Sequence, residues 1–206
     1  MIDLVSILLN DVSEAQIRLK LTDTDANRRD VIRTIFAAVD GMVFLYREFV
    51  RDALEQMEML TDAERVVLSE KALFVSDKGK IFEQTKHLST AAAIRLVSRM
   101  AHRANPEFEI NFENDRWARF KLAIQIRNRI THPKSVANMH VSTQDLEHVQ
   151  SSFYWLMDAI LSSMQASTSA MSDFVSGIGG VVDQLKAGDP ETWELYRVAS
   201  SNVSSD

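Results

Sequence analysis

The residues best suited to chemistry lie in one stretch, Arg127-Asn128-Arg129-Ile130-Thr131-His132-Pro133. Residues five apart on an α-helix point about 140° apart around its axis, so an unbroken helix would direct Arg127 and His132 to different sides. Pro133 disfavours helical geometry at His132, and the helix is expected to end between the two residues. The imidazole is then free to fold back toward the guanidinium. A guanidinium offers paired donors to a phosphate, and an imidazole transfers protons near neutral pH.

The element that positions this stretch is a helix expected from about residue 114. Its predicted buried face consists of four apolar residues, Trp117, Phe120, Ala123 and Ile124. Arg127 follows the last two at helical spacing, so it should rise from the edge of the apolar stripe and not from the solvated face. A charge in that position favours a functional role.

The spacing Arg127-x4-His132, with polar Asn128 after the arginine, resembles the motif of the HEPN domains. These domains are all-helical and often dimeric, and they carry Arg-x(4 to 6)-His late in the fold. The resemblance implies that Arg127, Asn128 and His132 are catalytic and cleave RNA without a metal or other cofactor. It also implies a homodimer across the motif helices. A second spacing of this kind, Arg95 with His102, has neither the polar residue nor the proline.

Two further residues are candidates for substrate binding. Arg129 precedes His132 by three residues, so it either contacts phosphate or is an ordinary solvated charge. Asp40 lies at helical spacing from Phe36 and Phe44, which places a carboxylate near the edge of the core. Acidic residues from this region assist the motif in some proteins that the chain resembles, so we include Asp40 as a hypothesis.

Composition excludes several classes of protein. The 206 residues are 46% hydrophobic and 25% charged, as expected for one globular core. A net charge of −6 means that any RNA contact must be local. The absence of cysteine excludes disulfides and thiolate zinc sites and suits the cytoplasm. No apolar run approaches the roughly 20 residues of a membrane span, and no signal peptide is evident, so we expect no membrane association.

Hydrophobic periodicity predicts an all-α, single-domain bundle of five to seven helices over residues 1–199, with an up-down core of long helices and a loose tail over 200–206. Six helices are expected, over about 4–19, 32–57, 61–71, 90–104, 114–131 and 142–164. A polar run weakens the last of these, and one more short helix is expected from 189. An amphipathic piece over about 174–185 contains three glycines, which leaves its structure open. Residues 73–88 fit a hairpin or a structured loop equally well, and 107–112 an extended segment.

Other chemistries lack their motifs. The sequence contains no His-Glu-x-x-His, no carboxylate-rich calcium loop, no phosphate loop and no nucleophile elbow. Together with the resemblance, it therefore predicts a metal-independent endoribonuclease that uses the RNA 2′-hydroxyl as nucleophile. A toxin role with an antitoxin partner, a defence role and a processing role remain open. The alternative is a non-catalytic module for dimerisation, partner docking or nucleotide binding.

Overall fold

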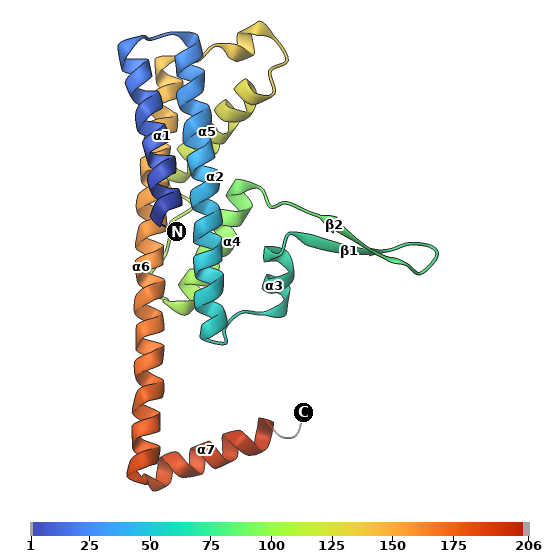
Figure 1. Cartoon of the computed structure of the whole chain (residues 1–206), viewed down its shortest axis with the longest axis vertical. Helices are drawn as coiled ribbons and strands as arrows, with labels where there is room; N and C mark the ends of the chain where they lie inside the picture. Colours follow the sequence, from blue (N-terminus) through green and yellow to red (C-terminus); the bar gives the residue numbers. More distant parts are fainter. Residues whose placement is uncertain (1, 204–206) are drawn as a thin grey trace. The chain divides into compact units, whose positions relative to one another are not determined.

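The computed structural model describes the backbone of residues 2–203 and the side-chain burial of residues 4–198. This described part is mostly α-helical, as predicted (Figure 1). Its helices are α1 (Ile2–Leu21), α2 (Asp25–Gln56), α3 (Asp62–Leu68), α4 (Thr90–Ala104), α5 (Asp115–Thr131), α6 (Thr143–Ala187) and α7 (Pro190–Val203), with a 3-10 turn η1 (Val136–Met139). None of the described helices is long and apolar enough to cross a membrane.

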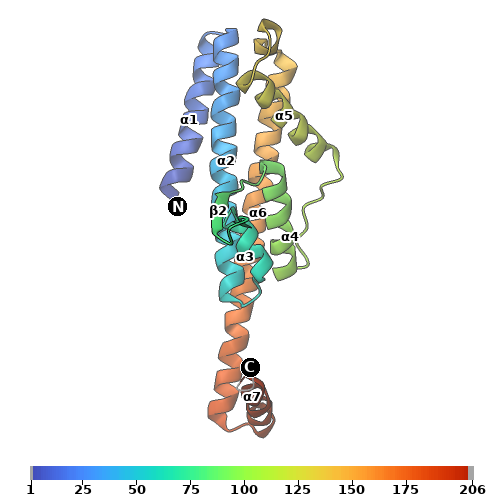
Figure 2. The ribbon, with the colours of Figure 1, turned by 90° about the vertical axis from the view of Figure 1, so that its right-hand side faces the viewer.

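The chain divides into two compact units, Met1–Ser167 and Thr168–Asp206, where the sequence indicated one domain to residue 199. In the first unit, α1 and α2 run side by side in opposite directions (Figures 1 and 2). Their contact explains the glycine inside α2, because a Cβ on Gly41 would lie 2.6 Å from Leu8 Cδ1. Close approach of another helix is therefore the reason for this glycine.

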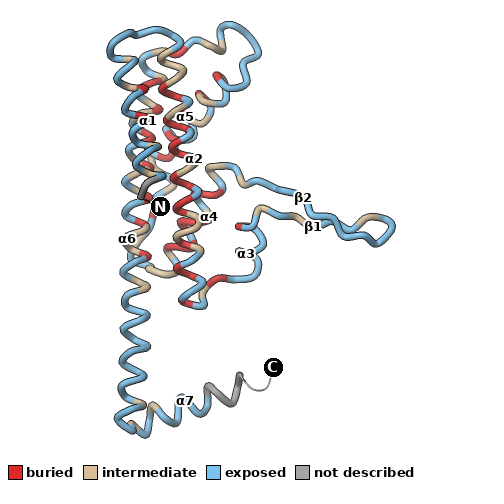
Figure 3. The backbone as a smooth tube through the Cα atoms, viewed as in Figure 1, coloured by how far each residue is buried: buried red, intermediate tan, exposed pale blue. Residues whose placement is uncertain are grey.

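The core of the first unit lies where α2, α4, α5 and the first part of α6 meet (Figure 3). Its largest fully buried side chains include Trp117, Tyr46 and Phe120. The Tyr46 hydroxyl lies 2.6 Å from Ser163 Oγ and also bonds Ser98 Oγ at 3.3 Å. Burial raises the pKa of Tyr46, against the effect of these two hydrogen bonds. Trp117 and Phe120 are thus core residues, as the predicted buried face required.

Helix α5 begins where predicted, because the Asn114 side chain caps it by accepting from the Trp117 N–H at 2.9 Å. The predicted buried face is wrong at one position. Ile124 is only half-buried, whereas Ile126 and Ile130 are buried beside Ala123 and complete the stripe. The core surrounds α5 on two sides, so the apolar stripe is wider than one helix partner would require.

Helix α6 is continuous to Ala187, so the predicted break in the polar run 162–172 is wrong. Two buried serines in this run are compatible with the helix because their hydroxyls have hydrogen-bond partners. Ser163 bonds Tyr46, and Ser167 donates to the Ser163 carbonyl at 3.0 Å. The short helix expected from 189 is α7, which continues to Val203. The predicted tail is therefore helical through Val203, and residues 204–206 lie outside the described part.

Residues 71–85 form an antiparallel hairpin of β1 (Lys71–Val75) and β2 (Ile81–Thr85), which is one of the two structures the sequence left open. Phe74 pairs with Phe82, and Gly79 occupies the turn with φ +70°. Nearly every residue of both strands is exposed (Figure 3). Residues 107–112, for which an extended segment was expected, form no strand.

Glu64 ties α3 to α4, and its charge should contribute to stability. It completes a capping box with Thr61 and forms two hydrogen bonds with the Arg103 guanidinium at 2.8 and 2.9 Å. The Arg103 hydrogen bonds are the main cause that lowers the pKa of Glu64 to about 2. We expect Glu64→Gln to reduce the free energy of unfolding at pH 7 by about 1–2 kcal/mol.

This loss should depend on pH with a defined sign. A carboxylate with a lowered pKa in the folded state stabilises fully above the ordinary glutamate pKa of about 4.3, and its contribution falls as the pH drops toward 2. The difference between the parent and Glu64→Gln should therefore shrink below about pH 4. Urea unfolding at several pH values measures it, with exposed Glu14→Gln as control. A difference that is constant with pH would contradict this assignment.

Candidate functional site

The motif stands at the end of α5, as the sequence predicted. The helix ends at Thr131, and His132 is the residue that follows, with φ −122° and ψ 60°. Its N–H still donates to the Asn128 carbonyl at 2.9 Å, and Pro133 then prevents a further helical turn. The imidazole of His132 is consequently exposed at the helix terminus.

Arg127 is anchored by residues far away in the sequence. Its Nη2 donates to Asp40 Oδ2 at 3.1 Å, and its guanidinium lies 5.3 Å from the centre of the Phe36 ring on α2. Asp40 also accepts from the Thr90 hydroxyl at 3.1 Å, so three helices meet at this carboxylate. The Arg127 side chain is only 27% exposed, which confirms its position at the edge of the core. The structure thus brings together Asp40 and Arg127, two of the predicted site residues.

A groove opens beside the motif. It is lined by residues of α5 and of the loop that follows, namely Gln125, Asn128, Arg129, His132, Lys134 and Asn138. These residues are two cations, a histidine and three carboxamides, with no carboxylate among the lining side chains. In a chain with a net charge of −6, this is a local surface that suits an anion. The sequence interpretation missed Gln125, Lys134 and Asn138, although Lys134 follows Pro133 directly.

Arg129 holds the loop beside the groove. Its Nη1 donates to the His140 carbonyl at 2.7 Å, and its Nη2 donates to Asp145 Oδ2 at 2.9 Å. Burial acts to raise the pKa of Asp145, but hydrogen bonds from Ser142 and the charge of Arg129 lower it below its ordinary value. Arg129 is therefore not an ordinary solvated charge, and a contact with phosphate stays a prediction. It is an ion-paired residue that still contributes to the wall of the groove.

Three arginines of α2 also fix this loop. Arg28 donates to the Val141 carbonyl at 2.9 Å and Arg29 donates to the Met139 carbonyl at 2.9 Å. Arg33 donates to the carbonyl of Ile130 at 3.2 Å, at the end of α5. Nothing in their local sequence marked these arginines, because their acceptors are about a hundred residues away. Their hydrogen bonds attach the end of α5 and the loop after the motif to α2.

Arg127 and His132 do not meet within one chain. Arg127 Nη1 donates to Asn128 Oδ1 at 3.1 Å. Its Nη2 donates to Asp40, so the guanidinium is directed at α2. Among the described residues, none forms a hydrogen bond with the His132 ring, and Arg127 does not line the groove. The expected fold-back of the imidazole toward the guanidinium is not observed. Asn128 connects the two, because it contacts Arg127 and lines the groove with His132.

The second pair, Arg95 and His102, has structural contacts. The Arg95 guanidinium lies 5.3 Å from the ring centre of Phe112 and 5.4 Å from that of Trp117. The His102 Nδ1 lies 2.8 Å from the Phe108 carbonyl oxygen. Both residues therefore attach the segment before α5 to the core, which favours Arg127 and His132 as the functional pair.

No group of three or more His, Asp or Glu side chains that could hold a metal occurs among the described residues. Comparison with protein-family models, curated proteins and solved structures finds no significant match to this chain. The geometry of the site therefore carries the functional argument.

Proposed function

We propose that this protein is a metal-independent endoribonuclease whose site is built from Arg127, Asn128 and His132, in line with the resemblance to HEPN domains. The observation that carries the proposal is the groove at the end of α5. It joins an exposed imidazole to cationic and carboxamide side chains without a lining carboxylate. A phosphate in this groove would find hydrogen-bond donors and a group able to transfer protons.

The proposed reaction is an internal transesterification. The RNA 2′-oxygen attacks the adjacent phosphorus as the bond from phosphorus to the 5′-oxygen breaks, which leaves a 2′,3′-cyclic phosphate and a 5′-hydroxyl. A neutral imidazole accepts the proton of the 2′-hydroxyl, and an imidazolium donates a proton to the leaving 5′-oxygen. Because the substrate supplies the nucleophile, the reaction needs no activated water.

The placement of Arg127 supports our proposal of a site shared between two subunits. Within one chain, Arg127 is directed toward Asp40 and away from the groove of His132. A two-fold axis beside the motif would set Arg127 of one subunit opposite His132 of the other, because an isologous interface presents each patch to its own copy. We therefore propose a homodimer across the ends of α5.

Incubation of the purified protein with total RNA in excess EDTA tests this function. Cleavage should persist and yield 2′,3′-cyclic phosphate and 5′-hydroxyl ends. His132→Ala, purified in the same way, is the control for contaminating nucleases. Strict dependence on added magnesium, or equal cleavage by the control, would refute the proposal.

Asp40 acts in this scheme as a positioning residue for Arg127. We expect Asp40→Ala to lower the rate of RNA cleavage by about tenfold, since a guanidinium freed from its partner spends less time in the productive position. Asp52→Ala is the matched control, because Asp52 is also an exposed carboxylate of α2 paired with an arginine, Arg51. Rates and circular dichroism should be measured for both variants. Equal rates for the two would exclude this role for Asp40.

A non-catalytic interaction module is the second candidate, and the hairpin favours it. Five large apolar side chains of β1 and β2 are exposed, Leu73, Phe74, Val75, Ile81 and Phe82. Exposed apolar surface of this kind is common where proteins bind partners. Absence of RNA cleavage with an intact fold would favour this candidate, with the hairpin as the first segment to test for partner binding.

A further inference from the structure

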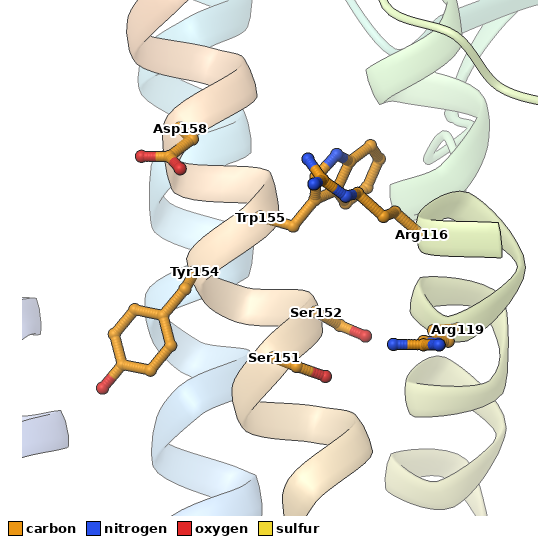
Figure 4. A pocket seen from close by; sticks show the side chains of 7 residues that line it. All are labelled: Arg116, Arg119, Ser151, Ser152, Tyr154, Trp155 and Asp158. Atoms are coloured by element: carbon orange, nitrogen blue, oxygen red, sulfur yellow. The ribbon is translucent and has the colours of Figure 1, made fainter. Parts of the chain in front are cut away.

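A second polar hollow lies between α5 and α6, away from the motif groove. It has a volume of about 260 Å³ and shares no lining residue with that groove. Figure 4 shows the side chains around it; Ser151, Ser152 and Trp155 point from α6 toward α5, whereas Tyr154 and Asp158 point to the other side. The ones that matter are Arg116 and Arg119 on α5 and Ser151, Ser152, Trp155 and Asp158 on α6.

The two arginines of this hollow differ from the others on α5. Arg127 and Arg129 pair with Asp40 and Asp145, whereas Arg116 and Arg119 have no hydrogen bond or ion pair in the described part of the chain. They are three residues apart on one helix, so their like charges are neighbours and repel each other. An anion between them would remove this repulsion.

Ser152 provides a second, independent observation that points to a ligand. Its side chain is 3% exposed, and its Oγ is buried without a hydrogen-bond partner among the described residues. Two other serines of α6 have partners for their hydroxyls. Ser151 donates to the His148 carbonyl and Ser167 donates to the Ser163 carbonyl, each about one turn back. A buried hydroxyl left unpaired is costly, and it is retained here beside two unpaired cations.

The directions of the side chains agree with an anion in the hollow. In Figure 4 the hydroxyls of Ser151 and Ser152 point toward the α5 side, where the guanidinium of Arg119 lies. Asp158, the one carboxylate in the lining, points away from the arginines in the same view and forms no ion pair with either of them. Two kinds of donor, guanidinium and hydroxyl, thus converge on one space.

We propose that this hollow binds the terminal phosphate group of a small phosphorylated ligand. Paired guanidinium donors match the oxygens of a phosphate, and the buried Ser152 hydroxyl supplies a further donor. A terminal phosphate reaches a buried hydroxyl more easily than a backbone phosphodiester, which carries a substituent on each side. The volume is below the roughly 300–1,000 Å³ of most ligand pockets, so it suits the phosphate and not the whole ligand. Trp155 offers an apolar wall for the next part of the molecule.

Binding of inorganic phosphate tests the site directly. Isothermal titration at constant ionic strength should show saturable binding to the parent protein. Arg119→Gln and Ser152→Ala should each weaken it by about tenfold, the loss expected for one hydrogen bond to a charged group. Arg99→Gln is the matched control, because Arg99 is an exposed arginine, likewise without a partner in the described residues, that lies outside this hollow.

Ser152→Ala also separates binding from folding. Without phosphate this variant should be at least as stable as the parent, since it removes an unpaired buried hydroxyl. No saturable binding by the parent, or equal binding by all variants, would overturn the proposal. Competition between phosphate and an uncleavable 2′-O-methyl RNA without terminal phosphates would overturn the assignment to a small ligand. The site does not depend on RNA cleavage, so its test is independent of the motif variants.

Discussion

Replacing His132 by alanine should reduce the rate of RNA cleavage by at least about 100-fold, and Arg127→Ala should do the same. General acid and base catalysis and a charge aimed at the developing oxyanion each contribute on that scale. The exposed His132 ring forms no hydrogen bond within the described residues, so its loss should leave the helical circular dichroism spectrum unchanged. Cleavage is measured with a labelled RNA under single-turnover conditions.

The second Arg and His pair provides the control for this result. Arg95→Ala and His102→Ala should retain the specific activity of the parent per folded molecule, although their contacts with Trp117 and Phe108 predict lower stability. If Arg95 or His102 is required for cleavage while His132 is dispensable, the catalytic motif has been assigned to the wrong helix.

A mixture of the two inactive variants should regain activity. If Arg127 of one subunit serves His132 of the other, a heterodimer of Arg127→Ala and His132→Ala contains one site with both residues and one site with neither. Random pairing makes about half of the dimers mixed, so the mixture should recover about a quarter of the parent activity. Coexpression with two different tags gives the mixed dimer in pure form.

This experiment distinguishes a shared site from a site within one chain. If both residues acted within the same subunit, each subunit of the mixed dimer would lack one of them and no activity would return. Mass measurement by light scattering across a dilution series provides a second check. A 23.3 kDa species with full specific activity would exclude the shared site.

Local sequence determined the features that depend on neighbouring residues. Thr61 and Glu64 have the spacing of a capping box, in which two residues bond each other across one turn, and a helix was predicted to start at 61. Pro133 predicted the end of α5, since its ring acts on the residue immediately before it. The stripe of α5 predicted that Arg127 would stand at the edge of the core. The prediction nevertheless placed Ile124 in the buried face and missed Ile126, because the stripe alone does not show how many helices surround α5.

Only the tertiary structure decided what each charged side chain contacts. Asp40 and Arg127 are 87 residues apart, and nothing local indicates that they bond, or that Arg127 consequently faces away from His132. Ser163 of α6 likewise bonds Tyr46, which lies on another helix 117 residues away in the sequence. The unpaired hydroxyl of Ser152 becomes recognisable only when α5 places two arginines opposite it. An ion pair or a buried hydrogen bond forms between surfaces that folding brings together, whereas caps, helix ends and apolar stripes arise within a few turns of one helix.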